Sequence, residues 1–329
     1  MQSTTQSSAA ASRWATSRTA AEILSRYGIV LAFIALCVIL SFANQYFLTP
    51  GNILNVLRQT SINGILAVGM TFVILTGGID LSVGSVLAFC GMVSASFVTG
   101  TAPWNPVFAI GLGLLCGLLL GSVNGLLVAK LRVPPFVATL GMLSVARGLT
   151  LIYNNGMPVP NLSPQYRFIG MGMLADIPVP VLVFALVAAG SWFVLRYTTY
   201  GRYVYAVGGN ERSAKTSGIN TRRIIFSVYA IAGALAGLSA QVLTARTSSA
   251  LVQAGQAYEL DAIAAVVIGG TSLSGGIGGL TGTIFGALII GVINNGLDLM
   301  GVSSYYQQVI KGTIIVLAVL LDYSRQRND

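Results

Sequence analysis

Long stretches of this sequence contain no charged residue at all, and this property constrains the fold more than any other. Lysine and arginine contribute 18 residues and aspartate and glutamate 9, so 8% of the 329 residues are charged. Soluble domains usually carry about 25%. Hydrophobic residues make up 54% of the chain, more apolar surface than a soluble protein can cover. We therefore predict an integral membrane protein.

The apolar stretches predict about ten transmembrane helices, because about 20 mostly apolar residues cross a bilayer. The ten ranges are 28–47, 60–79, 81–99, 107–129, 133–153, 179–196, 224–244, 258–272, 280–299 and 306–322. The eighth range is short and strongly apolar only from Ile263 to Ile268, so we expect it to be broken or tilted. The predicted fold class is an all-α polytopic membrane protein.

Basic residues are distributed unevenly between the two predicted sides. With the N-terminus inside, 13 of the 18 basic residues fall in inside segments, and Arg58, Arg167 and Arg246 fall outside. Cytoplasmic loops are enriched in lysine and arginine, so both termini are predicted to be cytoplasmic. Topology thus explains the net charge of +9, and no nucleic-acid partner is expected. We predict a disordered cytoplasmic tail at 1–26, a transmembrane domain at 27–323 and a second tail at 324–329.

The composition argues against an enzyme. The chain has no histidine, and its sequence shows no nucleophile paired with a base. A partial phosphate-loop match runs from Gly209 to Thr216 after a strand-like YVYAV, but Ala214 stands where that motif requires glycine. The surrounding loop of about 27 residues is too short for a nucleotide-binding domain. We expect no catalytic residue, no metal and no bound cofactor in this chain.

Polar residues within or beside the predicted spans are candidates for a transport pathway or for helix packing. Asp298 and Lys311 lie on the last two spans and are predicted to pair, while Arg147 lies in the fifth. Charged residues at such depth serve ion relays, substrate pathways or structural pairing, and the sequence leaves all three open. The residues assigned here are Asn63, Asp80, Asn124, Asn294 and Asn295.

Glycine spacing predicts close packing between helices. Glycines recur every four residues at 113, 117, 121 and 125, and shorter repeats occur at 278, 282 and 286 and at 233 and 237. Small residues at this spacing let two helix backbones approach closely. The packing partner is either another helix of this chain or a second subunit.

Three apolar segments resemble the sugar-type permease subunits of bacterial ABC importers, a group that also contains branched-chain amino-acid permeases. They are QTSINGILAVGMTFVILTGGIDLSVGS (59–85), YELDAIAAVVIGGTSLSGG (258–276) and NNGLDLMGVSSYYQQVIKG (294–312). The polar segment GRYVYAVGGNERSAKTSGIN (201–220) is similar to the loop of this family that contacts the ATPase. Within the group, LMGVSSYYQ and YELDAIAAVV are most similar to ribose permeases, and xylose and allose permeases share much of the pattern.

The resemblance implies a permease without an ATPase site, located in the bacterial inner membrane. It implies a homodimer around one pathway, a cytoplasmic ABC ATPase subunit and a periplasmic sugar-binding protein. The implied function is transport of a monosaccharide, with ribose favoured, by alternating access. An ion-coupled secondary sugar transporter and an ABC permease for xylose or allose remain the alternatives.

The segment from Gly208 to Gly218 is the predicted contact with the ATPase. Asn210 is a favourable N-cap, and Glu211 and Lys215 are favourably spaced, which predicts a helix of about two turns between flexible glycines. A helix this short is unstable alone, so we expect a partner surface to order it, with Ala214 at the contact. The residues assigned to this coupling loop are Gly208, Gly209, Asn210, Glu211, Ala214, Lys215, Ser217 and Gly218.

The predicted outside loops carry few charges, which we take to be Arg58, Arg167, Asp176, Arg246, Glu259 and Asp261. Such isolated charges can set the orientation of a soluble partner. We hypothesise that Arg167 or Arg246 meets an acidic surface of the sugar-binding protein. The alternative is that these two arginines only anchor the chain at the membrane interface.

Overall fold

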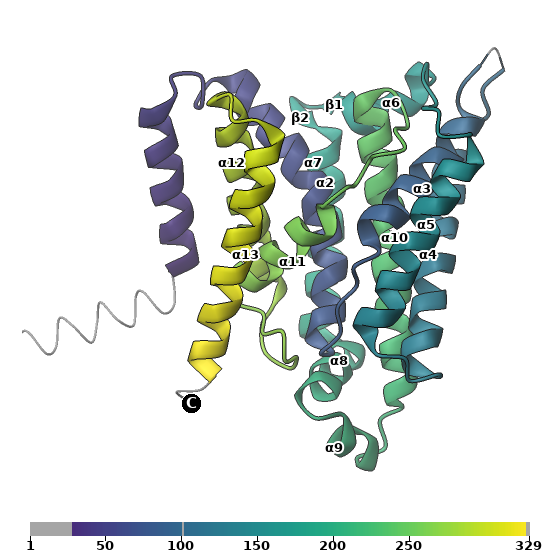
Figure 1. The fold of residues 1–329 in the computed structure, drawn as a ribbon, viewed down its shortest axis with the longest axis vertical. Coiled ribbons are helices and arrows are strands. Elements are labelled where there is room, and N and C mark those ends of the chain that lie inside the picture. Colours follow the sequence, from purple (N-terminus) through teal and green to yellow (C-terminus); the bar gives the residue numbers. More distant parts are fainter. Residues whose placement is uncertain (1–27, 101, 327–329) are drawn as a thin grey trace, which may run out of the picture.

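The computed structural model describes residues 28–100 and 102–326, and these form a bundle of helices with one small hairpin (Figure 1). A first helix, Gly28–Ala43, precedes the labelled elements. These are α2 Pro50–Leu75, α3 Val83–Phe97, α4 Pro106–Ala129, α5 Pro135–Tyr153, α6 Pro164–Met171, β1 Met173–Leu174, β2 Ile177–Pro178, α7 Val179–Tyr197, α8 Thr199–Gly209, α9 Glu211–Thr216, α10 Thr221–Thr247, α11 Tyr258–Ile268, α12 Leu280–Leu299 and α13 Ser304–Gln326. The two strands pair antiparallel, with Met173 opposite Pro178.

Among the described residues, five helices are long and apolar enough to cross a membrane, namely α4, α5, α7, α10 and α12. Each of the ten predicted ranges overlaps a helix, while the number of crossings stays a prediction. Two boundaries are corrected. The eighth range is helical only to Ile268, and α13 continues to Gln326, into the predicted C-terminal tail. The predicted tail at 1–26 lies outside the described part of the chain.

The bundle has two distinct ends (Figure 1). The beginning of helix Gly28–Ala43 and the last turn of α13 lie at the same end as α8 and α9 (Figure 1). We call this the α9 end. The short helix α6 and the β1–β2 hairpin lie at the opposite end, which we call the α6 end (Figure 1).

Helix α10 occupies the centre and packs against α2, α3, α4 and α6. Its contact with α4 is the most extensive in the bundle, and it depends on glycine. Gly117 and Gly121 of α4 lie directly against the backbone of α10 at Gly233, where an added Cβ would overlap backbone atoms. The glycine repeat of the fourth predicted span is therefore a packing surface within this chain.

The second glycine repeat joins α11 to α12. Gly282 and Gly286 of α12 pack on the backbone of Gly269 and Ala265. Gly278 does not belong to this surface, because it precedes α12 and adopts a φ of 132°, which favours glycine. The repeat predicted from spacing therefore has two helical members rather than three.

The polarity of the helix surfaces separates an interior from a lipid-facing exterior. Residues 60–75 of α2 are all buried, which places this helix inside the bundle. The outer helices instead expose large apolar side chains, among them Leu119 of α4, Ile152 of α5 and Leu186 of α7. Lipid tails can cover such side chains without cost, so these faces suit a bilayer.

Two non-helical segments enter the bundle, residues 76–82 before α3 and residues 248–257 before α11. Helix α11 lies about halfway between the two ends (Figure 1). Backbone at such depth needs hydrogen-bond partners inside the protein. Arg147 of α5 supplies two of them, because its Nη1 donates to the carbonyl oxygens of Val252 at 2.6 Å and Ala254 at 3.1 Å.

The α4–α10 contact predicts a strong position dependence for glycine substitution. We expect Gly121→Leu to lower the stability by about 1–3 kcal/mol, because the leucine overlaps α10. Gly111 of the same helix is exposed with open space around it, so Gly111→Leu is the matched control. Thermal unfolding in detergent should show a lower Tm for Gly121→Leu alone. Equal effects of the two substitutions would contradict this packing.

Candidate functional site

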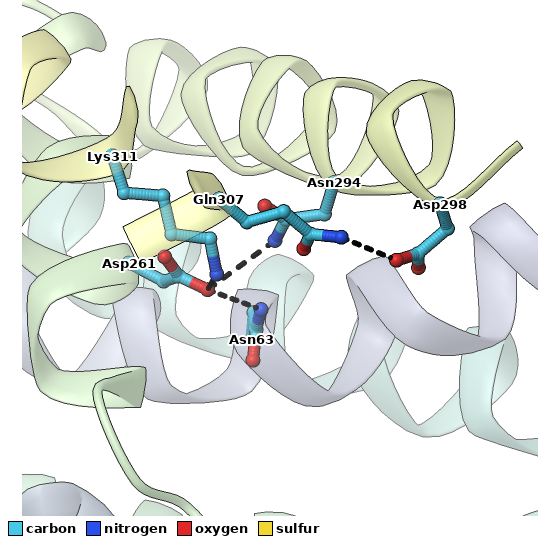
Figure 2. A network of polar contacts seen from close by, with 6 residues as sticks. All are labelled: Asn63, Asp261, Asn294, Asp298, Gln307 and Lys311. Carbon is cyan, nitrogen blue, oxygen red and sulfur yellow. Dashed lines mark hydrogen bonds and ion pairs between the residues drawn. The ribbon is translucent and has the colours of Figure 1, made fainter. Parts of the chain in front are cut away.

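Polar side chains from four helices meet at the carboxylate of Asp261 on α11. Its Oδ2 accepts hydrogen bonds from Lys311 Nζ of α13 at 3.0 Å, from Asn294 Nδ2 of α12 at 3.3 Å and from Asn63 Nδ2 of α2 at 3.4 Å (Figure 2). The side chain of Asp261 is 2% exposed and that of Lys311 18%. We call these four residues the Asp261 cluster.

The position of Asp261 follows from the way α11 begins. The helix starts after Ala257, which has a φ of 64° and contributes no side-chain cap. Glu259 and Asp261 lie in its first turn, where negative charge interacts favourably with the helix dipole. Burial of a carboxylate is nevertheless costly without a counter-charge. Lys311 supplies that charge, and over the residues described its pair with Asp261 is the one ion pair.

The Asp261 cluster also contains acceptors that receive no hydrogen bond. These are Oδ1 of Asn63, Oδ1 of Asp261 and Oδ1 of Asn294, and each of the three residues is at most 5% exposed. A buried acceptor without a donor costs free energy. The cluster therefore has spare capacity to accept hydrogen bonds from water or from hydroxyl groups. Hydrogen bonding of this kind suits recognition of a polar group.

All five polar residues singled out from the sequence are buried, but they lie in separate places. Asn63 and Asn294 belong to the Asp261 cluster. Asn295, the neighbour of Asn294, exchanges two hydrogen bonds with Asn52 at the start of α2, at 2.8 and 2.9 Å. This pair fastens α12 to α2.

Asp80 and Asn124 form another polar group, around the segment that precedes α3. Asp80 Oδ1 accepts from the Ser82 amide at 2.9 Å and from the Ser82 hydroxyl at 2.6 Å. Asn124 Nδ2 of α4 donates to Ser82 Oγ at 2.9 Å. These contacts hold the non-helical segment 76–82 against α4, which is a structural role.

Two predicted placements of charge are wrong. Lys311 pairs with Asp261 and not with Asp298, which is exposed and accepts a hydrogen bond from Gln307 Nε2 at 2.8 Å (Figure 2). Asp261 was assigned to an outside loop, but it is buried inside the bundle. The sequence did contain a signal for this burial. Seven apolar residues follow Asp261 up to Ile268, and such a run is not typical of a surface loop.

The segment predicted to couple to an ATPase forms two short helices at the α9 end. The strand-like YVYAV is helical, as part of α8. The predicted cap is confirmed, because Asn210 Oδ1 accepts from the Ser213 amide at 2.9 Å. Gly218 follows α9 with a φ of 86°, as expected for a glycine that ends a helix.

Ala214 does not lie where the sequence placed it. It is 4% exposed and packs in an apolar cluster with Val204 of α8 and Ile224 of α10. In addition, Thr221 Oγ1 donates to Glu211 Oε1 at 3.0 Å. Contacts within the chain therefore order α9. The exposed surface of this helix consists of polar residues such as Lys215, and Ser217, which follows the helix, is exposed as well.

Gly208 and Gly209 also differ from the prediction, because both are helical and not a flexible hinge. Gly208 lies directly against the carbonyl oxygen of Leu75 at the end of α2 and against the backbone of Gly276. The Gly276 amide donates to the same Leu75 oxygen at 3.0 Å. The backbones of α8, α2 and the α11–α12 connection thus meet at one point.

The two arginines proposed for docking both belong to the α6 end. Arg167 lies on α6 and is half-buried. Arg246, in the last turn of α10, donates from Nη2 to Asn55 Oδ1 at 2.8 Å. Helix α6 packs on α10, so the two arginines lie on elements that are in contact.

Comparisons with known proteins identify similar sequences. The family described as "Branched-chain amino acid transport system / permease component" matches residues 52–319. The ribose import permease of Bacillus subtilis (strain 168) is 50% identical over 91% of this chain and 93% of its own length, and that of Escherichia coli (strain K12) is 48% identical over 90% and 93%. The D-allose transport system permease of Escherichia coli (strain K12) is 42% identical over 86% of each chain. No solved structure matches.

The Asp261 cluster predicts that removal of its cation is more harmful than removal of both charges. Lys311→Met leaves the Asp261 carboxylate buried and unpaired, so we expect a loss of about 3–5 kcal/mol in stability. Combining it with Asp261→Asn should recover most of this loss. Asp298→Asn, an exposed carboxylate on α12, is the control and should be neutral. Thermal unfolding of Lys311→Met, Asp261→Asn, their combination and Asp298→Asn measures the coupling, and additive losses would disprove it.

Proposed function

The chain belongs to the family of branched-chain amino acid transport system permease components, and we propose that it is the membrane-spanning subunit of an ATP-driven ribose importer. The identity of 50% to a ribose import permease over 91% of the chain carries this proposal. The relatives for other sugars are less similar, at 42% for allose and 35% for xylose. The substrate class is therefore a monosaccharide, with ribose as the preferred member.

We propose ten crossings of the bacterial inner membrane, with both termini and the α9 end in the cytoplasm. The excess of basic residues in the predicted inside segments supports this orientation. The first helix and α13 support an even number of crossings, because the first helix begins and α13 ends at the α9 end (Figure 1).

The proposed partners follow from the same orientation. A cytoplasmic ABC ATPase subunit contacts α8 and α9, and a periplasmic sugar-binding protein docks at the α6 end near Arg167 and Arg246. The chain acts as a homodimer and carries no ATPase site, catalytic residue or cofactor of its own. ATP hydrolysis by the partner drives alternating access of the pathway.

An ion-coupled secondary transporter is the rival mechanism, and the Asp261 cluster is the observation that favours it. A buried ion pair is a possible ion or proton relay. In our proposal the same pair has a structural role, because Lys311 already neutralises Asp261. The energy source separates the two mechanisms.

Ribose uptake in proteoliposomes tests the function. With the ATPase subunit and the binding protein present, we expect labelled ribose to accumulate only with ATP, and excess allose or xylose to compete weakly. Vesicles without the ATPase, energised by a proton or sodium gradient, are the control. Uptake in those control vesicles would establish the secondary mechanism instead.

Cross-linking tests the placement of the ATPase. In a variant whose cysteines at 37, 90 and 116 are replaced, Ser217→Cys just after α9 should cross-link to the ATPase subunit. Gln165→Cys, exposed on α6, is the matched control and should react with an impermeant reagent added outside cells. Cross-linking of the ATPase at Gln165→Cys would reverse the proposed orientation.

A further inference from the structure

A hollow of about 910 Å³ opens at the α9 end, beside the segment assigned to the ATPase. Three connections form its wall. They are Thr76 to Gly78 after α2, Val128 to Pro135 around the α4–α5 turn, and the stretch from α9 into the first turns of α10. Glu211, Lys215 and Gly218 of the segment assigned to the ATPase line the hollow, whereas Arg132 and Arg222 on the other walls have no role in the assignments made above.

Four cationic side chains line the hollow, and they come from three different elements. Arg132 belongs to the α4–α5 turn, Arg212 and Lys215 to α9, and Arg222 to the first turn of α10. All four are exposed, and none forms an ion pair with an acidic residue of the described chain. Such a cluster of like charges attracts an anion.

The single acid in the wall does not neutralise these cations. Glu211 lines the hollow, but its Oε1 accepts a hydrogen bond from Thr221 Oγ1 at 3.0 Å. Four positive charges therefore face one negative charge. Arg132 has a φ of 59°, an uncommon conformation for a residue other than glycine, at the turn that brings it to the hollow.

The rest of the wall combines polar residues, among them Thr76, Asn220 and Thr221, with an apolar part, and the apolar part restricts the kind of anion that fits. Val128, Ala129, Val133 and Ile225 line the hollow together with the four cations. Val128 and Ala129 lie at the end of α4, Val133 lies in the α4–α5 turn and Ile225 lies near the start of α10. Helices α4 and α10 are two of those long and apolar enough to cross a membrane. A free phosphate would satisfy the cations and leave this apolar wall uncovered. An amphiphile with an anionic head satisfies both.

We propose that this hollow binds the phosphate headgroup of an anionic phospholipid. The headgroup lies among Arg132, Arg212, Lys215 and Arg222, and the glycerol and first acyl carbons cover the apolar wall. Because the cations come from α9, α10 and the α4–α5 turn, one bound lipid joins these three elements. The position of the site at the cytoplasmic leaflet rests on the proposed topology, whereas binding itself does not.

Lipid binding to the purified full-length chain tests the proposal. The chain is delipidated in neutral detergent, and phosphatidylglycerol or phosphatidylcholine is added. Native mass spectrometry counts bound lipid, and thermal unfolding reports stabilisation. We expect phosphatidylglycerol to be retained and to raise the Tm, with little effect of phosphatidylcholine. Each removed cation should weaken binding about fivefold, since a basic residue near an anionic surface contributes about 1 kcal/mol.

Two neighbouring arginines provide a matched pair of variants. Arg222 lines the hollow and Arg223 does not, although both are exposed in the first turn of α10. We expect Arg222→Gln to weaken phosphatidylglycerol binding about fivefold, and Arg132→Gln with Arg222→Gln about 25-fold. Arg223→Gln should bind like the unmodified chain. Equal weakening by Arg222→Gln and Arg223→Gln would mean general surface attraction and overturn the site.

Two further arms identify the source of the anion. Inorganic phosphate and glycerol phosphate that raise the Tm as much as phosphatidylglycerol would show a free-anion site and overturn the lipid assignment. Loss of ATPase-subunit binding in Arg222→Gln, with lipid binding unchanged, would assign the cations to the ATPase instead. None of these readouts needs ribose uptake, so failure of the proposed transport function is distinguishable from failure of this proposal.

Discussion

A carboxylate inside an apolar bundle requires a cation within reach, and the pair of Asp261 with Lys311 meets this requirement. The positions of α11 and α13 depend on it. Helix α11 is short and lies deep in the structure, and among the described elements it is the main contact of α13. Asn63 and Asn294 extend the same contact to α2 and α12. One charged group thus organises four helices.

The same constraint governs the backbone. The two non-helical segments before α3 and α11 carry peptide groups that lipid cannot satisfy. Arg147 binds carbonyl groups of one segment, and Asp80 with Ser82 and Asn124 orders the other. The segments also approach each other, because Gly84 at the start of α3 lies against the backbone of Gly255. Polar residues that looked like pathway candidates in the sequence are in part the supports of these interruptions.

Features that depend on local sequence were predictable, and features that depend on tertiary packing were not. Apolar length located the helices, glycine spacing marked the packing faces of α4 and α10, and Asn210 marked the start of α9, because each signal is contained in one segment. The burial of Ala214 depends on α8 and α10, which no local pattern reports. The choice of Asp261 over Asp298 as the partner of Lys311 depends on how α13 lies across α11.

The meeting of Gly208, Leu75 and Gly276 has a mechanical consequence. Side chains between packed helices can change rotamer and absorb small displacements, whereas three backbones in direct contact have no such compliant layer. The contact of α8 with the end of α2 and with the α11–α12 connection is therefore stiff. A displacement of α8 by a fraction of an ångström therefore requires a similar displacement at the end of α2 and in the α11–α12 connection, which couples this short helix to the interior of the bundle.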